Sequence, residues 1–363
     1  MAPSVSELLN APVEIFQKVA PSASKAKTLE KEREAGASYP FYLPTFDLNE
    51  KFPPIEIFDH VEAGTRANPA KPTFINDNVT LNHLSPYLGT EVTGVELSEL
   101  TKEGLDELAL FAAERKVLLF RDQKFKDIGA DRQIEIAKHF GPIHRHPTSG
   151  NVKGYPEFHV VYRSENHDPF SEYRGGNRTN YTGWHSDVSY EKQPPGTTFF
   201  FILDQPEIGG DTIFLSQVEA YNRLSDEFKK RLEGLRAVHS AGPQAEYSRQ
   251  RGGPVRREPI ETEHPLVRVH PATGEKALYV NQNFTQRIAG FKKEESDYLL
   301  NFLYDHLAKG SDFQIRASYK PGTVVVWDNR VTCHSATPDF SPKFRRHAVR
   351  LTPQAEVPVE AKA

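Results

Sequence analysis

The sequence predicts a mainly β fold with flanking helices, of the sandwich or jelly-roll type. Short apolar runs typical of strands recur in the second half of the chain, at 197–203, 212–215, 276–280, 323–327 and 346–352. Turns rich in Pro, Gly and Asp separate these runs. Helical periodicity is confined to a few segments, so the strand–helix alternation of a parallel α/β sheet is missing.

The first residues differ from the rest in composition and periodicity, so we predict an N-terminal extension, 1–75, and one jelly-roll domain, 76–363. Residues 20–37 are rich in Lys, Glu and small residues, and residues 39–70 in Pro and aromatics with little periodicity. Such chain is typical of loops that wrap over a domain. A disordered leader is the alternative for the first thirty-five residues.

The domain begins with alternating strand and helix signals. Residues 88–97 alternate like a strand or hairpin, and 117–120 form a short apolar run typical of a buried strand. Helical spacing of apolar residues predicts helices over 102–116 and 131–140, the second ended by a Gly-Pro pair. Two more helices, 218–235 and 292–307, are expected to interrupt the later strands.

Composition excludes several classes of protein. The 363 residues carry a net charge of −4 with both signs mixed, which argues against a dedicated nucleic-acid or membrane-surface protein. A single cysteine, Cys333, allows no intramolecular disulfide and favours a reducing compartment. No apolar run reaches bilayer length, and the N-terminus does not resemble a secretory signal. We therefore expect a cytoplasmic protein.

A His-x-Asp pair, His185 and Asp187, is the first candidate for chemistry. In extended chain, residues two apart face the same side, so an imidazole and a carboxylate would lie together. The fourteen histidines give one other His-x-acid pair, His60 and Glu62, which lies in a Pro-rich stretch without a strand pattern. The sequence therefore favours His185 and Asp187 as ligands of a catalytic ferrous iron; a surface loop histidine is the alternative.

The third ligand that we predict is His334. Two strands of a jelly roll can bring ligands that are distant in sequence to one metal, and two His with one carboxylate form the facial triad of non-haem Fe(II) oxygenases. A hydrogen-bonded core histidine is the alternative. Cys333, as a strand neighbour, should face the opposite side and behave as a small buried hydrophobe.

Two arginines, Arg346 and Arg350, are expected on one face of the last strand. Their planar guanidiniums suit a small dianionic or sulfonated ligand. The alternative is a basic edge strand that is charged to prevent sheet-to-sheet association. Thr212 follows a Gly-Gly-Asp turn and could donate to a ligand carboxylate; an ordinary strand threonine is its alternative.

These residues lie in motifs that together resemble one known family. Between residues 84 and 358 the chain is similar to the taurine dioxygenase family of Fe(II)/2-oxoglutarate enzymes, and within it to fungal sulfonate dioxygenases. The motifs are Trp184-His185-Ser186-Asp187, Gly209-Gly210-Asp211-Thr212, Asn281-Gln282-Asn283-Phe284-Thr285, Trp327-Asp328-Asn329-Arg330-Val331-Thr332 continuing to His334, and Arg345-Arg346 with Arg350.

The resemblance implies a double-stranded β-helix, a cupin-like jelly roll, and assigns roles to residues. His185, Asp187 and His334 would bind iron. Arg346 and Thr212 would hold 2-oxoglutarate. The substrate pocket would contain four residues that match the family pattern by position: His146, Tyr181, Phe284 and Arg350.

Three departures from the family pattern bear on substrate and cosubstrate. The spacing from His334 to Arg346 is one residue longer than in the bacterial taurine enzymes, so Arg345 is an alternative to Arg346. Ser149 stands where those enzymes have a tyrosine, and Tyr181 where they have an asparagine. These changes affect taurine itself more than the sulfonate class.

The expected activity is that of a dioxygenase that uses Fe(II), 2-oxoglutarate and O2 to hydroxylate a small sulfonate at the carbon bearing sulfur. Sulfite and an aldehyde would leave with succinate and CO2. Alternatives are another small anion (an alkyl sulfate, amino acid, phenoxyacetate or purine), or a zinc hydrolase or a binding protein without redox chemistry. We expect a small anionic substrate and no nucleic-acid or membrane partner; the sequence leaves a homo-oligomer open.

Overall fold

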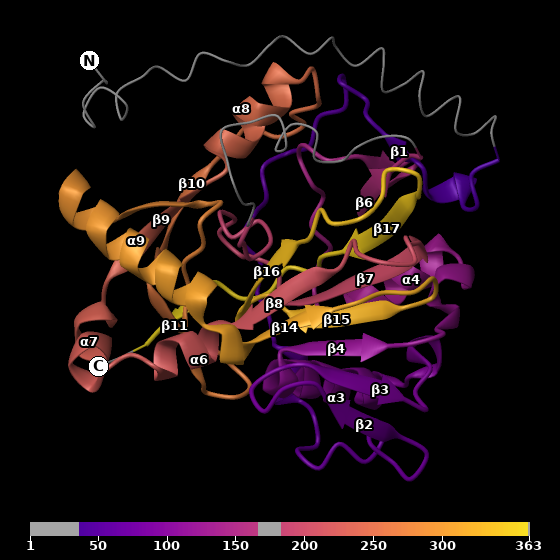
Figure 1. The fold of residues 1–363 in the computed structure, drawn as a ribbon, viewed down its shortest axis with the longest axis horizontal. Coiled ribbons are helices and arrows are strands. Elements are labelled where there is room, and N and C mark those ends of the chain that lie inside the picture. Colours follow the sequence, from indigo (N-terminus) through magenta and orange to yellow (C-terminus); the bar gives the residue numbers. More distant parts are fainter. Residues whose placement is uncertain (1–35, 166–182, 362–363) are drawn as a thin grey trace.

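A large sheet dominates the computed structural model, which describes residues 36–165 and 183–361 (Figure 1). Its strands are β1 (Pro44–Thr45), β2 (Thr80–His83), β3 (Thr90–Thr93), β4 (Val117–Phe120), β5 (Asn151–Val152), β6 (Tyr155–Arg163), β7 (Thr197–Asp204), β15 (Val324–Asp328) and β17 (Arg346–Leu351). Within the described residues these nine strands lie in the order β1-β5-β6-β17-β7-β15-β4-β3-β2. Neighbours are antiparallel except for β3 and β4.

A smaller sheet packs against the middle of the large one. It consists of β14 (Gln314–Ala317), β8 (Thr212–Ser216) and β16 (Thr332–Ala336), in that order. Phe214 of β8 contacts Trp327 of β15, with ring centroids 5.6 Å apart, and both belong to a buried cluster with Phe200 of β7 and Ala348 of β17. Two facing antiparallel sheets around one apolar core form a jelly roll, as the sequence predicted.

Two helices cover the large sheet, where the sequence placed them. Helix α3 (Lys102–Arg115) is capped by the Thr101 side chain, which accepts from the Gly104 N–H. Helix α4 (Ala130–Lys138) buries Ile134, Ile136 and Ala137 in a second core cluster, to which Leu108 of α3 also belongs. Short 3-10 helices lie at Pro40–Tyr42, Ala63–Thr65, Leu97–Glu99, Lys124–Asp127 and Ser311–Phe313.

The remaining helices gather beside one end of the large sheet, with two small sheets (Figure 1). The helices are α6 (Gln217–Asn222), α7 (Asp226–Leu232), α8 (Gly242–Gln250) and α9 (Lys293–Lys309). One sheet contains β9 (Arg236–Ser240), β10 (Glu261–Pro265) and β13 (Thr285–Ile288). The other contains β11 (Val267–Val269), β12 (Lys276–Leu278) and β18 (Val359–Glu360). The single helix predicted over 218–235 is wrong. The chain breaks because the Ser225 side chain accepts from the Phe228 N–H and starts a second helix.

Residues 36–75, the described part of the predicted extension, pack against the rest of the chain, and Tyr42, Ala63 and Phe74 belong to its core. Strand β1 pairs with β5, and the Phe52 N–H donates to the Arg256 carbonyl at 2.6 Å. The buried Gln193 side chain holds the Phe58 backbone through both its amide oxygen and its amide nitrogen, each at 2.9 Å. Residues 1–35 lie outside the described ranges, so the expected leader there stays a prediction.

The arginine-bearing strand is an interior strand. Strand β17 pairs with β6 on one side and with β7 on the other, and all six of its residues are buried. The alternative of a basic edge strand is therefore wrong, because neither edge of β17 is open to another sheet.

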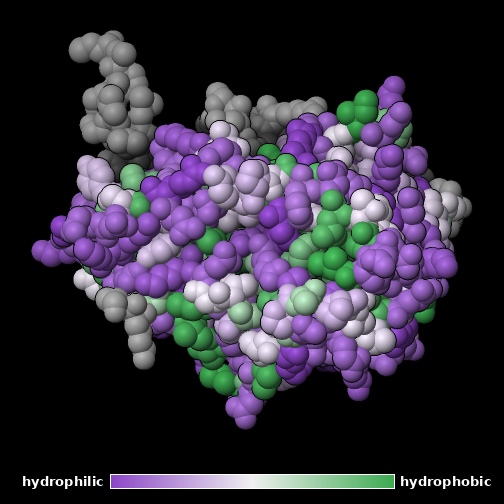
Figure 2. Space-filling view, turned by 90° about the horizontal axis from the view of Figure 1, so that it is seen from below, coloured by the Kyte–Doolittle hydropathy of each residue, from purple (hydrophilic) through white to green (hydrophobic). Residues whose placement is uncertain are grey.

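The outer face seen in Figure 2 is largely hydrophilic, and its hydrophobic side chains gather in small patches. Within the described ranges, no helix combines the length and the apolar character needed to cross a membrane.

Candidate metal centre and anion pockets

His185, Asp187 and His334 come together as the sequence predicted. The Nε2 atoms of His185 and His334 lie 3.5 Å and 3.6 Å from Asp187 Oδ1, and one ligand atom of each residue lies within 4.8 Å of the others. Backbone hydrogen bonds in both directions, of 3.0 Å and 2.8 Å, join residues 185 and 334. The predicted extended strand is reduced to this single bridge, and Asp187 already belongs to a turn.

Neighbouring groups fix how the ligands point. The proton on His185 Nδ1 is donated to the Gly183 carbonyl at 2.7 Å, which leaves the Nε2 lone pair directed at the other ligands. Asn329 holds the backbone of Asp187 from both sides. Its Oδ1 accepts from the Asp187 N–H at 2.7 Å, and its Nδ2 donates to the Asp187 carbonyl at 3.0 Å.

The charges of the three ligands fit a divalent metal. Burial alone would raise the pKa of Asp187, but Arg350 and the two imidazoles hold it well below its usual value. Burial and His185 lower the pKa of His334, which keeps that imidazole neutral with a free lone pair. Asp187 Oδ2 is buried without a hydrogen-bond partner in the described residues. One anionic and two neutral donors with an unfilled acceptor suit octahedral Fe(II).

A second acidic cluster is not a metal site. His60, Glu62 and Glu356 also lie within coordinating reach of one another. Their centre is filled by the Arg330 guanidinium, which pairs with Glu62 and, at 3.2 Å, with Glu356. A cation would therefore displace a buried ion pair. Cys333, next to His334, is not part of the candidate centre, because its buried thiol lies against the Ser186 hydroxyl and the Val280 carbonyl.

Arg350 lies beside the metal ligands. Its Nη1 donates to Asp187 Oδ1 at 2.5 Å, and its Nη2 contacts His159 Nδ1 at 2.5 Å. The ring of His146 lies 4.5 Å from the ring of His159. Burial, followed by neighbouring charges, lowers the pKa of both histidines well below the usual value, so both are neutral. Arg350 and His146 therefore border one region next to the candidate metal centre.

Phe284 also lies at this region. Its ring is 6.1 Å from that of His185 and 5.1 Å from that of Tyr190. The side chain of Asn281 holds Phe284 by accepting from its backbone N–H at 2.9 Å. Tyr181, the remaining predicted substrate residue, lies outside the described residues.

Arg346 is the other arginine of the predicted pair. Its guanidinium is buried, donates through Nε to the Gly210 carbonyl at 3.0 Å, and has no carboxylate partner among the described residues. A Cβ at Gly210 would come within 3.2 Å of the Arg346 side chain, so glycine makes room for it. Burial lowers the Arg346 pKa to about 10, which still leaves it charged at neutral pH. Arg345 instead faces Glu165, at 3.6 Å.

Thr212 and Tyr319 accompany Arg346. Burial raises the pKa of the Tyr319 phenol, while Thr212 and Arg346 act in the opposite direction, so both are its neighbours. The Tyr319 hydroxyl is buried and has no hydrogen-bond partner in the described residues. A buried cation without an acid, beside a threonine and an unpaired hydroxyl, fits the carboxylate of a bound anion.

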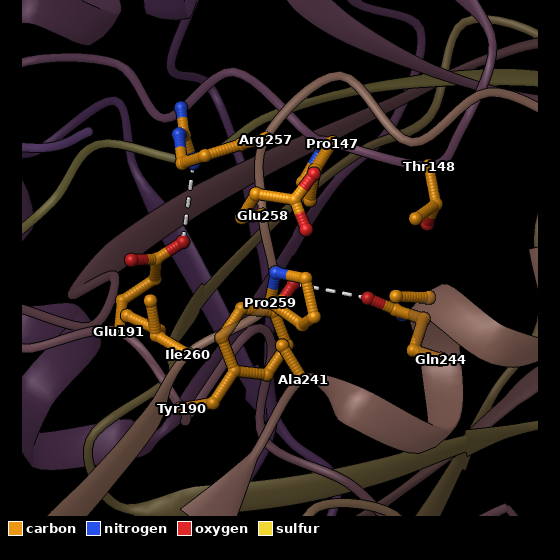
Figure 3. A pocket seen from close by; sticks show the side chains of 11 residues that line it. Pro147, Thr148, Tyr190, Glu191, Ala241, Gln244, Arg257, Glu258, Pro259 and Ile260 are labelled. Atoms are coloured by element: carbon orange, nitrogen blue, oxygen red, sulfur yellow. Dashed lines mark hydrogen bonds and ion pairs between the residues drawn. The ribbon is translucent and has the colours of Figure 1, made fainter. Parts of the chain in front are cut away.

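Figure 3 shows a pocket that is lined in part by Pro147 and Thr148, the two residues that follow His146 in the chain. Tyr190 donates to Gln244 at 2.9 Å, and Arg257 pairs with Glu191 at 3.2 Å. The enclosed space is about 10 Å³, enough for about one water molecule, so this pocket is too small for a substrate.

Three residues of the site were missed from sequence. Asn329 lies in a motif that pointed to His334, but nothing in the sequence shows that it holds Asp187. His159 and Tyr319 lie in or beside strands and belong to no motif that the sequence analysis used. Only the pairing of β6 with β17 and of β14 with β8 places them near Arg350 and Thr212.

Comparisons with known proteins agree with this geometry. A family model described as taurine catabolism dioxygenase TauD, TfdA family, matches residues 80–352. The alpha-ketoglutarate-dependent dioxygenase cnsM of Penicillium expansum is 48% identical over 329 residues, covering 89% of this chain and 91% of that protein. An alpha-ketoglutarate-dependent sulfonate dioxygenase of Saccharomyces cerevisiae is 42% identical, covering 93% and 83%. A taurine dioxygenase structure from Burkholderia xenovorans superposes with a TM-score of 0.63 at 30% identity, covering 78% and 91%.

Proposed function

The chain belongs to the TauD/TfdA family and is a 2-oxoglutarate-dependent dioxygenase, and from this premise we propose that it hydroxylates a small sulfonate at the carbon that bears sulfur. The observation that carries the proposal is the pair of guanidiniums on β17. Arg350 lies against the metal ligand Asp187, and Arg346 is buried without an acid of its own in the described residues. The chain thus offers two anion sites, one for a cosubstrate and one for a substrate.

The cofactors are Fe(II), 2-oxoglutarate and O2, and we assign the iron to His185, Asp187 and His334. When bound, they supply the oxidation that converts 2-oxoglutarate to succinate and CO2 and adds a hydroxyl group to the substrate carbon. A carbon that carries both hydroxyl and sulfonate collapses to an aldehyde and sulfite. Asn329 and the Gly183 carbonyl keep Asp187 and His185 in position throughout.

Arg346, with Thr212 and the Tyr319 hydroxyl, would bind the distal carboxylate of 2-oxoglutarate. A carboxylate there supplies the missing partner of a buried cation, whose burial is otherwise costly. Arg345 is the weaker candidate, because its side chain faces Glu165.

Arg350 and His146 would bind the sulfonate. The Nδ1 atom of His146 accepts from the backbone N–H groups of Thr148 and Ser149, at 3.3 Å and 3.2 Å, so its proton is on Nε2 and can be donated. Phe284, packed beside His185, would cover the apolar part of the substrate and exclude water from the reacting carbon.

Two arginine variants test this division of labour. Arg350→Ala should lose sulfonate turnover, measured as sulfite release, while it still binds 2-oxoglutarate in an anaerobic titration that follows the visible charge-transfer band with iron. Arg346→Ala should lose the 2-oxoglutarate signal. Equal loss of both properties in Arg350→Ala would contradict the assignment.

A substrate panel of an alkyl sulfonate, an alkyl sulfate and a carboxylate of matched length tests the substrate class. Sulfite release from the sulfonate, together with dioxygen-dependent succinate, is the expected result. If succinate formed only in the presence of the sulfate or the carboxylate, that compound would replace the sulfonate as the proposed substrate.

A further inference from the structure

We propose that His159 is a third donor to the anionic head group of the substrate, and that with Arg350 and His146 it selects a head group with three oxygens. The proposal rests on the proposed function, because it concerns the same substrate site.

His159 lies on the same face as Arg350. The two residues are direct partners in the antiparallel pairing of β6 with β17, and side chains of directly opposite residues share one face of a sheet. Arg350 extends from that face to Asp187, so the face looks towards the metal centre. The His159 ring, in turn, lies 4.5 Å from the ring of His146. His159 is therefore placed between the two residues assigned to the sulfonate.

The contact with Arg350 fixes the position of the His159 proton. A guanidinium has no acceptor, so the short contact from Arg350 Nη2 requires that His159 Nδ1 accept the hydrogen bond. The ring proton is therefore on Nε2. His146 has the same tautomer, since its Nδ1 accepts from two backbone N–H groups. Neither Nε2 has a hydrogen-bond partner in the part of the chain that the structure describes.

This arrangement has the chemistry of one kind of head group. It offers one positive charge, from Arg350, and two neutral N–H donors, from His146 and His159. A sulfonate or sulfate ester carries one negative charge over three oxygens, so each oxygen can accept from one of the three side chains. A carboxylate has only two oxygens and would leave one N–H without an acceptor, which costs affinity. A phosphonate dianion would bring a charge that no second cation in this set balances.

Two substitutions distinguish the role of the His159 Nδ1 atom from that of its Nε2 atom. In His159→Asn, the amide oxygen lies near the position of Nδ1 and still accepts from Arg350, but the donor at Nε2 is lost. In His159→Gln, an amide N–H reaches the position of Nε2, but the acceptor for Arg350 is lost. His347→Asn is a matched control, because His347 is a buried histidine of β17 that donates to the Tyr42 carbonyl, away from the substrate pocket.

The probes are butane-1-sulfonate and pentanoate, titrated calorimetrically into full-length protein loaded with Mn(II) and N-oxalylglycine, so that no turnover occurs. The preference of the wild-type protein for the sulfonate should fall about tenfold in His159→Asn, the value of one lost hydrogen bond, and should be retained in His159→Gln and His347→Asn. Thermal unfolding of each variant shows whether its fold is intact.

Two outcomes overturn the proposal in distinguishable ways. A folded His159→Asn variant that retains the full preference shows that His159 does not contact the head group, and leaves the proposed function standing. A wild-type protein that binds pentanoate as tightly as butane-1-sulfonate removes the sulfonate function itself, and the role of His159 with it.

Discussion

Replacing Asn329 with Ala is expected to weaken iron binding, although Asn329 is not one of the proposed iron ligands. The fully buried Asn329 side chain touches none of the ligand atoms, but it makes two hydrogen bonds to the backbone of Asp187 and a third, of 3.4 Å, to the Pro195 carbonyl. Without the amide, the turn that begins at Asp187 loses the groups that orient it. The carboxylate would then spend part of its time away from the position shared with His185 and His334.

The size of the effect follows from those hydrogen bonds. Each of the two bonds to Asp187 contributes about 1 kcal/mol, and the Asp187 groups left buried without partners add to the cost. A loss of about 2 kcal/mol in holding the ligand corresponds to roughly thirtyfold in affinity, since 1.4 kcal/mol is tenfold. Outer partners of metal ligands typically contribute about 10–100-fold.

Gln193→Ala is the matched control. Gln193 is also a buried amide that holds backbone, through hydrogen bonds with Phe58 and with the Ala355 carbonyl, and it contacts no metal ligand. Both variants should unfold at lower temperature than the wild type in the absence of metal. Anaerobic titration with Fe(II), in the presence of 2-oxoglutarate, should show weaker binding only in Asn329→Ala.

Asn329→Ala could instead bind Fe(II) as tightly as the wild type while its unfolding temperature falls as much as that of Gln193→Ala. In that case Asn329 would stabilise the fold, and the other contacts of Asp187 would suffice to orient it. Equal weakening of iron binding in both variants would show that general loss of stability, not the contact to Asp187, lowers the affinity.

Two further measurements test the second anion pocket and the buried histidines. Tyr319→Phe should weaken 2-oxoglutarate binding to the Mn(II) protein about tenfold, because one buried donor is lost. Tyr279→Phe is the control, because it removes a comparable buried hydroxyl elsewhere and should leave this binding unchanged. Equal calorimetric affinity of Tyr319→Phe and the wild type would contradict a contact between Tyr319 and 2-oxoglutarate. Burial lowers the pKa of His264 and His347 to about 4, and the unfolded imidazoles titrate near 6.5. The unfolded chain therefore binds protons first, and stability should fall between about pH 6.5 and 4 by up to about 3 kcal/mol per histidine. The urea midpoint should therefore fall less steeply with decreasing pH in His347→Gln than in the wild type. The same pH dependence in both proteins would contradict this.

The elements of the fold were predictable where a local pattern determines them. Helix α3 and strand β4 begin and end close to the predicted residues, because capping by Thr101 and an apolar run are local signals. The break between α6 and α7 was missed, because Ser225 fits a helix interior as well as a cap and only the folded chain selects the cap.

The three candidate metal ligands could be selected from motifs, but the geometry that brings them together could not be predicted. The sequence suggested that strand alternation aligns His185 with Asp187. In the structure a single backbone bridge to His334 and a turn held by Asn329 do so. A side chain that holds backbone leaves no periodic signal, since its partner is a peptide group that every residue has.

The buried arginines show why charge pattern alone cannot separate structural from functional residues. Arg256, Arg268 and Arg330 are all fully buried, and each has a carboxylate from elsewhere in the chain: Glu50, Glu356, and Asp328 with Glu62 and Glu356. These ion pairs close within the protein and need no ligand.

Arg346 is nearly as buried, yet no described acid forms an ion pair with it. Asp211, which raises the Arg346 pKa from nearby, is itself paired with Arg316. A buried cation is stable only if its charge is balanced, and no described acid forms an ion pair with Arg346, so we expect a bound anion to complete that balance. This expectation depends on the fold, because the fold determines which arginines have an acid beside them. It supports the proposed assignment of Arg346 to 2-oxoglutarate without reference to the metal, and this assignment would fail if Arg346→Met neither weakened 2-oxoglutarate binding nor changed the stability gained from it.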